Sequence, residues 1–156
     1  MPKTKSKVWV DADSCPVQKE ITAVCNKFHT TPQFVATINH YKPDPSGEEW
    51  IYLDHGSQSV DLYILNHVKP HDIVITQDLS LGVLLTPQRV YVLTPRGKLI
   101  NEGDAVQIMN QKHLRQRTLK RKKKWKGPKA FTTEDREQFS RTLDDVLQMS
   151  IRESGI

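Results

Sequence analysis

The chain has 156 residues, a length that suits one domain with a substantial hydrophobic core. No apolar stretch approaches the roughly 20 residues of a membrane span, and no apolar segment of a secretory signal follows the lysine-bearing N-terminus. These features exclude a membrane-spanning protein and predict a cytoplasmic one.

Charge is distributed unevenly along the chain. The formal net charge is +5, yet nine basic residues and no acidic one lie between Arg115 and Lys129. Without these nine positive charges, the rest of the chain carries a net charge of −4. We call residues 115–129 the basic segment. An acidic body with one basic segment is typical of a protein that binds a polyanion such as nucleic acid.

Apolar runs and periodic apolar positions predict strands that alternate with helices. Strands are expected at residues 8–10, 33–38, 50–53, 73–76 and 89–93. Helices are expected at 16–28, 60–68 and 79–85, from 101 towards 119, and at 132–148. This alternation predicts one α/β domain, residues 1–156, with a mostly parallel central sheet in three layers. Residues 120–128 carry too much like charge for a stable helix and are expected to form a basic, mobile loop.

Local signals mark the expected helix starts. Pro16 suits the first helical position, where its missing N–H costs nothing. Ser57 or Ser59 can cap the helix at 60–68. Thr132, with Asp135 three residues later, resembles a capping pair for the last helix.

The two cysteines are not expected to form a disulfide. Cys15 and Cys25 lie on the same expected helix, roughly 15 Å apart at 1.5 Å per residue, whereas disulfide-bonded Cα atoms lie within about 7 Å. A position at a helix start could lower the thiol pKa of Cys15. No histidine is indicated as its base, so we expect Cys15 to be a packing residue.

The first expected strand, Val8-Trp9-Val10, leads directly into two carboxylates, Asp11 and Asp13. An apolar run without alternation is typical of a strand that is buried on both faces. Since alternate side chains of a strand point to the same side, the two carboxylates share a side if the chain stays extended. Open α/β sheets bind ligands at the carboxyl ends of their strands. The sequence therefore predicts a functional site there.

Two further carboxylates are expected at the same edge of the sheet. Asp78 follows the strand at 73–76, and Asp61 lies in the first turn of a helix. Carboxylates without histidine or thiolate partners suit a hard cation such as Mg²⁺ or Mn²⁺. Each residue also has a structural interpretation, because Asp61 suits the helix dipole and Asp78 can be an N-cap.

Other polar residues lie near the ends of the expected strands. Asp54 also ends a strand and is a weaker candidate, whereas Asp72 precedes its strand and is expected at the opposite edge. Thr76 could orient a carboxylate or a water molecule. The six histidines show no metal-ligand spacing, so zinc is not indicated.

Five blocks of the sequence resemble, in order, the signature of the bacterial YaiI/YqxD family. They are Asp11-Ala12-Asp13-Ser14-Cys15-Pro16-Val17, Val60-Asp61, Asp72-Ile73-Val74-Ile75-Thr76-Gln77-Asp78, Pro95-Arg96-Gly97, and a closing block with Gly127-Pro128, Asp135-Arg136, Phe139 and Leu143-Asp144. The resemblance covers nearly the whole chain. The family is similar in fold to PIN-like domains, whose metal-dependent nucleases hold Mg²⁺ or Mn²⁺ with clustered acids.

The resemblance implies a PIN-like α/β/α fold and a metal site at Asp11, Asp61 and Asp78, with Asp13 close by. The chain departs from the family pattern at His71, where glycine is usual, and at Leu79-Ser80-Leu81, where isoleucine-proline-leucine is usual. Neither departure removes a carboxylate. The resemblance supports the fold more strongly than the activity, because PIN-like domains can lose catalysis.

Together these features predict a metal-dependent nuclease that hydrolyses phosphodiester bonds, with Mg²⁺ or Mn²⁺ as cofactor. The similarity of the family to PIN-like domains implies RNA rather than DNA as the substrate. The predicted catalytic residues are Asp11, Asp13, Asp61 and Asp78. The predicted nucleic-acid-binding residues are Arg96, Lys120, Arg121, Lys122, Lys123, Lys124 and Lys126.

Two other functions fit parts of the same pattern. A haloacid-dehalogenase-like phosphatase also presents Asp-x-Asp after an apolar strand, although Cys15 stands where threonine or valine is usual there. A non-catalytic nucleic-acid-binding module would use the basic segment and leave the aspartates without a catalytic role. The basic segment also has a simpler explanation, because surface charge favours solubility.

Overall fold

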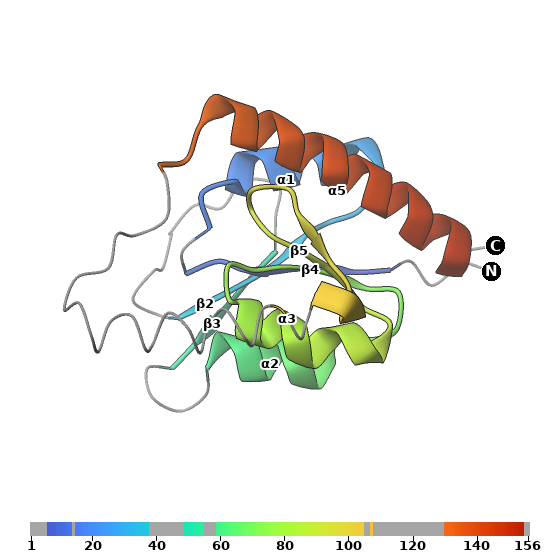
Figure 1. Ribbon diagram of the computed structural model, residues 1–156. Helices are drawn as coiled ribbons and strands as arrows, with labels where there is room; N and C mark the ends of the chain where they lie inside the picture. Colours follow the sequence, from blue (N-terminus) through green and yellow to red (C-terminus); the bar gives the residue numbers. More distant parts are fainter. Residues whose placement is uncertain are drawn as a thin grey trace, which may run out of the picture.

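The computed structural model describes residues 6–13, 15–37, 49–54, 59–104, 107 and 130–154. Its strands form one sheet with the order β3-β2-β1-β4-β5-β6 (Figure 1). They are β1 (Val8–Asp11), β2 (Gln33–Thr37), β3 (Glu49–Leu53), β4 (Ile73–Ile75), β5 (Tyr91–Leu93) and β6 (Leu99–Ile100). All neighbouring strands are parallel except β5 and β6, which are antiparallel. The strand β1 therefore lies in the middle, between β2 and β4.

Helices cover both faces of this sheet. They are α1 (Gln18–Lys27), α2 (Val60–His67), α3 (Leu79–Leu85), the short 3₁₀ helix η2 (Thr86–Gln88) and α5 (Thr133–Ser154). The helices α1 and α5 lie on one face, and α2 and α3 lie on the other (Figure 1). The predicted three-layer α/β/α fold is thus confirmed. Within the described ranges, no helix combines the length and the apolar character needed to cross a bilayer.

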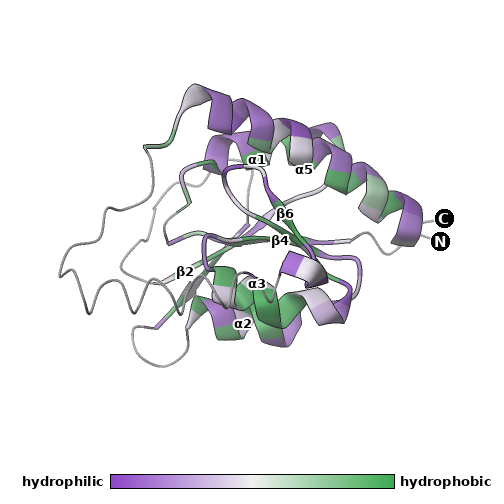
Figure 2. Ribbon diagram, in the orientation of Figure 1, coloured by the Kyte–Doolittle hydropathy of each residue, from purple (hydrophilic) through white to green (hydrophobic). Residues whose placement is uncertain are grey.

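The central strand is buried on both sides, which explains its apolar run without alternation. Val8 and Val10 pack in the cluster formed with α1 and α5, whereas Trp9, between them, packs in the cluster formed with α2 and α3. Figure 2 shows that α1 and α5 contain many hydrophilic residues, whereas α2 and α3 are rich in hydrophobic residues.

Two predicted elements begin two residues later in the structure, and the structure adds one strand. Helix α1 begins at Gln18 with Val17 as its N-cap, so the assignment of Pro16 to the first helical position is wrong. Strand β5 begins two residues later than predicted, because Arg89 ends η2 with a left-handed φ of 62°. Strand β6 has no counterpart among the predicted strands, since two residues are too few to show alternation.

Helix caps agree with the sequence signals. In the predicted capping pair, the Asp135 N–H donates to Thr132 Oγ1 at 3.1 Å and the Thr132 N–H donates to Asp135 Oδ2 at 3.0 Å. The Ser59 hydroxyl accepts a hydrogen bond from the Leu62 N–H at 3.2 Å. Helix α5 extends to Ser154, beyond the predicted 132–148. The predicted loop at 120–128 lies outside the described residues.

Candidate active site at the carboxyl edge of the sheet

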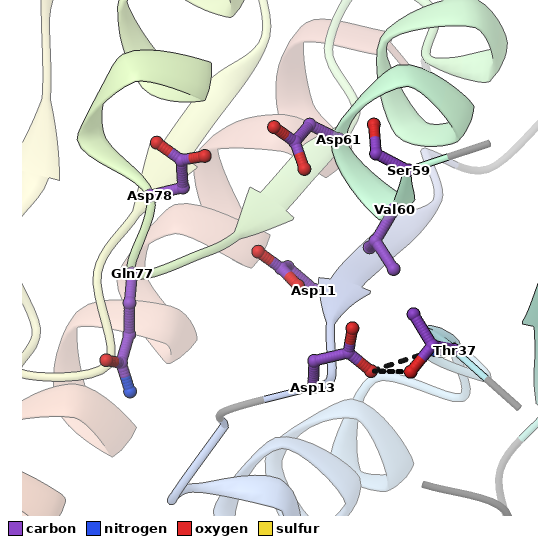
Figure 3. A pocket seen from close by; sticks show the side chains of 8 residues that line it. All are labelled: Asp11, Asp13, Thr37, Ser59, Val60, Asp61, Gln77 and Asp78. Atoms are coloured by element: carbon purple, nitrogen blue, oxygen red, sulfur yellow. Dashed lines mark hydrogen bonds between the residues drawn. The ribbon is translucent and has the colours of Figure 1, made fainter. Parts of the chain in front are cut away.

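A hollow of about 440 Å³ opens at the edge where the parallel strands end. We call it the acidic hollow, because half of the described residues that line it are aspartates and none of those described is basic. The lining residues are Asp11, Asp13, Thr37, Ser59, Val60, Asp61, Gln77 and Asp78. All four predicted catalytic residues therefore line one hollow. In Figure 3 the carboxyl groups of Asp11, Asp61 and Asp78 face a common space.

The alternation of side chains along β1 brings Asp11 to these neighbours. Trp9 points to the α2 and α3 side, and Val10 points to the α1 and α5 side. By alternation, Asp11 returns to the side of α2 and α3. Helix α2 carries Asp61 in its first turn, and α3 has Asp78 as its N-cap. The starts of two helices thus face the end of one strand.

Thr76, at the end of β4, connects two of the carboxylate residues. Its hydroxyl donates a hydrogen bond to Asp11 Oδ2 at 2.9 Å and accepts one from the Asp78 N–H at 2.9 Å. Thr76 is buried, with 1 % of its surface exposed. Its suggested role in orienting a carboxylate agrees with this geometry.

Asp78 and Asp13 each use one carboxylate oxygen to hold the local backbone. Asp78 Oδ1 accepts hydrogen bonds from the N–H groups of Ser80 at 2.9 Å and Leu81 at 3.3 Å, so the structural interpretation of Asp78 as an N-cap is confirmed. Asp13 Oδ1 accepts hydrogen bonds from Thr37 N–H at 2.8 Å and Thr37 Oγ1 at 3.3 Å (Figure 3). These bonds fix the orientation of both carboxyl groups at the acidic hollow.

The carboxyl groups affect one another electrostatically. Burial raises the pKa of Asp11 to about 6, and the charges of the other aspartates act in the same direction, whereas the Thr76 hydrogen bond opposes them. Burial also raises the pKa of Asp61, and the charge of Asp78 and a hydrogen bond with its side chain raise it further. Crowded carboxylates repel one another, and a bound cation would relieve that repulsion.

The donor chemistry fits a hard divalent cation, because every candidate ligand is a carboxylate oxygen. Within the part of the chain that the structure describes, however, no three His, Cys, Asp or Glu side chains are grouped as ligands of one ion. The charges of Asp61, Asp13 and Asp78 raise the pKa of Asp11, so the carboxyl groups interact electrostatically across the hollow.

Other predicted residues lie elsewhere. The buried Asp72 lies at the opposite edge, as expected, where it accepts hydrogen bonds from Lys7 N–H, Trp9 Nε1 and Lys69 N–H at 2.9, 3.0 and 2.9 Å. Asp54 does not line the acidic hollow. Arg96 contacts protein groups at the start of α5. The predicted nucleic-acid-binding residues from Lys120 to Lys126 lie outside the described residues.

Cys15 does not have the properties of an activated thiol. Burial raises its pKa to about 12, and the charges of Asp11 and Glu20 act in the same direction. The prediction that the helix start lowers the pKa of Cys15 is therefore wrong. Cys15 and Cys25 are both free, as their spacing predicted.

Four lining residues were not among the predicted site residues: the apolar Val60 and the polar Thr37, Ser59 and Gln77. Thr37 could have been found from the parallel register, because Asp11 pairs with Val35 and the next outward positions on the two strands are Asp13 and Thr37. Ser59 was recognised as a possible helix cap but not as a lining residue. Gln77 has no sequence signal other than its place between Thr76 and Asp78.

The fold and this edge define the class: a three-layer α/β/α protein with an acidic hollow at the ends of its central strands. The chain belongs to the YaiI/YqxD family, because the model described as "Uncharacterized BCR, YaiI/YqxD family" matches residues 9–149. This confirms the resemblance found in the sequence.

Relatives in two bacterial genera match along most of their length. A UPF0178 protein of Bacillus cytotoxicus is 40% identical over 142 residues, which cover 91% of this chain and 93% of the relative. One from Listeria monocytogenes is 37% identical over 142 residues, covering 91% and 97%. One from Bacillus pumilus is 34% identical over 146 residues, covering 93% and 88%. No solved structure gives a significant match to this chain.

Proposed function

We propose that this protein is a metal-dependent nuclease that hydrolyses phosphodiester bonds in RNA, with Mg²⁺ or Mn²⁺ bound by Asp11, Asp61 and Asp78. The observation that carries the proposal is the acidic hollow itself, where four aspartates from three segments of the chain line one space. Burying like charges together costs stability, so such an arrangement is more readily explained by a cation-dependent activity than by folding.

The residues divide into ligands and positioning groups. Asp11, Asp61 and Asp78 would hold the ion. The ion would activate a water molecule and neutralise charge that develops on the phosphate. Thr76 holds Asp11 through its hydroxyl. Asp13, tied to β2 through Oδ1, lines the same hollow and would orient the attacking water.

The charge distribution supports a polyanionic substrate, and the similarity of the family to PIN-like domains favours RNA over DNA. The basic segment would hold the phosphate backbone, while the acidic hollow holds the ion. Contacts to the backbone position a nucleic acid without reading its sequence, so this arrangement predicts no base specificity.

Incubation of the purified chain with end-labelled single-stranded RNA tests the proposal. Cleavage is expected with Mn²⁺ or Mg²⁺ and not with excess EDTA. The rival phosphatase would instead give a burst of product from a small phosphomonoester and an aspartyl phosphate on the protein. RNA binding without cleavage in the presence of either metal would overturn the proposed nuclease activity and favour the non-catalytic binding module.

Replacement of Lys122, Lys123 and Lys124 by Gln is expected to weaken RNA binding while leaving Mn²⁺ affinity nearly unchanged. Each phosphate neutralised on a single strand contributes a slope of about −0.7 in log affinity against log salt, so loss of two or three contacts should flatten the slope by roughly 1 to 2. Because salt at 0.1 M screens interactions between solvent-exposed charges beyond about 10 Å, we expect the metal site to be little affected. Binding measured across a series of salt concentrations checks this. An unchanged slope would mean that these lysines do not touch RNA.

A further inference from the structure

A serine hydroxyl lies at the rim of the acidic hollow. Ser59 is the N-cap of α2, and its Oγ accepts a hydrogen bond from the Leu62 N–H at 3.2 Å. A hydroxyl that accepts one bond still has its proton and a second lone pair. Among the residues that the structure describes, Ser59 Oγ has no second hydrogen-bond partner. This exposed hydroxyl is therefore able both to donate to a ligand and to accept from one.

Two threonine hydroxyls at the same edge of the sheet already use their protons within the protein. Thr37 Oγ1 donates to Asp13 Oδ1 at 3.3 Å (Figure 3), and Thr76 Oγ1 donates to Asp11 Oδ2 at 2.9 Å. Both threonines orient a carboxyl group of the hollow. Ser59 differs from them, because its bond holds the helix backbone and leaves its proton for a ligand.

Ser59 begins a run of three residues that all line the acidic hollow and differ in chemistry. It is followed by Val60 and Asp61, so that a hydroxyl, an apolar side chain and a carboxylate stand in succession at the start of α2 (Figure 3). A ribose unit has matching features. Its 2′-hydroxyl is both a donor and an acceptor, and its ring carbons are apolar.

A phosphate oxygen fits this run less well than a sugar hydroxyl does. Because it is negatively charged and only accepts hydrogen bonds, Ser59 would attract it while Asp61 would repel it. A neutral hydroxyl can accept from Ser59 and also donate to an oxygen of Asp61. The proposed ion would neutralise charge on the phosphate, which leaves the start of α2 for the ribose.

We propose that Ser59 binds the ribose 2′-hydroxyl of the nucleotide at the acidic hollow, which makes it a specificity-determining residue for RNA over DNA. This inference rests on the proposed function. The 2′-hydroxyl is the group by which a protein distinguishes RNA from DNA at a given site. One hydrogen bond between neutral groups should give a preference of about 3- to 10-fold for ribose.

Single 2′-deoxy substitutions in the RNA test this inference on the full chain. When successive positions of an end-labelled strand are replaced, Mn²⁺-dependent cleavage by the wild type should fall about 3- to 10-fold at the position that loses the hydroxyl facing Ser59. Ser59→Gly removes the serine hydroxyl, and glycine remains an acceptable N-cap. This variant should cleave the all-ribose strand more slowly by the same factor, and the deoxy substitution should then cause no further loss.

Two further variants serve as comparisons. Ser59→Thr retains the hydroxyl and should retain the preference for ribose. Ser80→Ala is the matched control, because it removes a serine hydroxyl from the first turn of α3, outside the lining of the hollow, and keeps the backbone N–H that binds Asp78. It should show the wild-type preference. Mn²⁺ affinity and the midpoint of thermal unfolding should stay close to wild type in Ser59→Gly.

The ratio of cleavage between ribose and deoxyribose separates sugar recognition from other roles. If Ser59 only caps α2, or if it contacts phosphate, Ser59→Gly would slow cleavage of both strands by the same factor, and this result would overturn the inference. Equal cleavage of both strands by the wild type would also overturn it, while leaving the metal-dependent nuclease in place. Absence of cleavage of either strand by the wild type would overturn the proposed function and this inference together.

Discussion

Asp11→Asn and Asp78→Asn should each reduce Mn²⁺-dependent RNA cleavage by about 100-fold or more, since even partners that only orient a metal ligand are worth 10- to 100-fold. Both changes remove a charged ligand while the local hydrogen bonds persist. In Asp11→Asn the side-chain amide oxygen could still accept the Thr76 hydroxyl, and in Asp78→Asn the amide is as good an N-cap as the carboxylate for the start of α3. The loss should therefore appear as chemistry and metal binding, not as unfolding.

Calorimetric titration with Mn²⁺ and circular dichroism separate these effects. Both variants should show weaker Mn²⁺ binding and a wild-type spectrum. The exposed Asp145 on α5 provides a matched control, because Asp145→Asn removes the same charge far from the acidic hollow in sequence and on a different element. Wild-type cleavage in either site variant would remove that residue from the proposed metal site.

The sheet and the position of the acidic residues were predictable because each depends on local rules. A continuous apolar run such as Val8-Trp9-Val10 indicates burial on both faces, and two such strands placed in parallel bring Asp11 and Asp78 to the same edge. The prediction of Asp61 at this edge required only that a helix begin on the same side of the sheet. The convergence of these three residues therefore follows from strand direction and chain order, without knowledge of the packing.

Contacts between distant segments were not predictable by the same means. The bond from Arg136 to the Pro16 carbonyl joins residues 120 positions apart, and it depends on how α5 packs across α1. No periodicity or cap in the sequence encodes that packing. The start of α1 differed from prediction for a related reason, because Pro16 has a favourable φ for a helix but here belongs to the turn that connects β1 to α1.

Asp11→Asn is also expected to stabilise the metal-free protein near pH 8. The folded-state pKa of Asp11 is raised from 3.8 to about 6, so between these values the folded protein binds more protons than the unfolded chain and the free energy of unfolding falls as pH rises. A difference of roughly 2 pH units corresponds to about 3 kcal/mol at 1.36 kcal/mol per unit, which is an upper estimate because water can partly relieve the burial. Asn does not titrate and avoids this cost.

The gain in stability of Asp11→Asn should depend on pH, and the wild type should become the more stable protein when Mn²⁺ is added. In EDTA at pH 8, Asp11→Asn should raise the midpoint of thermal unfolding by several degrees, at about 2–4 °C per kcal/mol for a chain of this size. The gain should shrink towards zero by about pH 4. At that pH the Asp11 carboxyl of the folded wild type is protonated, and the same carboxyl of the unfolded chain is close to being protonated. Added Mn²⁺ should stabilise the wild type much more than the variant, since a ligand stabilises only the state that binds it. Two results would contradict the view that Asp11 is retained for a cation and not for folding. One is an Asp11→Asn variant that is less stable than the wild type at pH 8 in EDTA, and the other is a gain in stability as large at pH 4 as at pH 8.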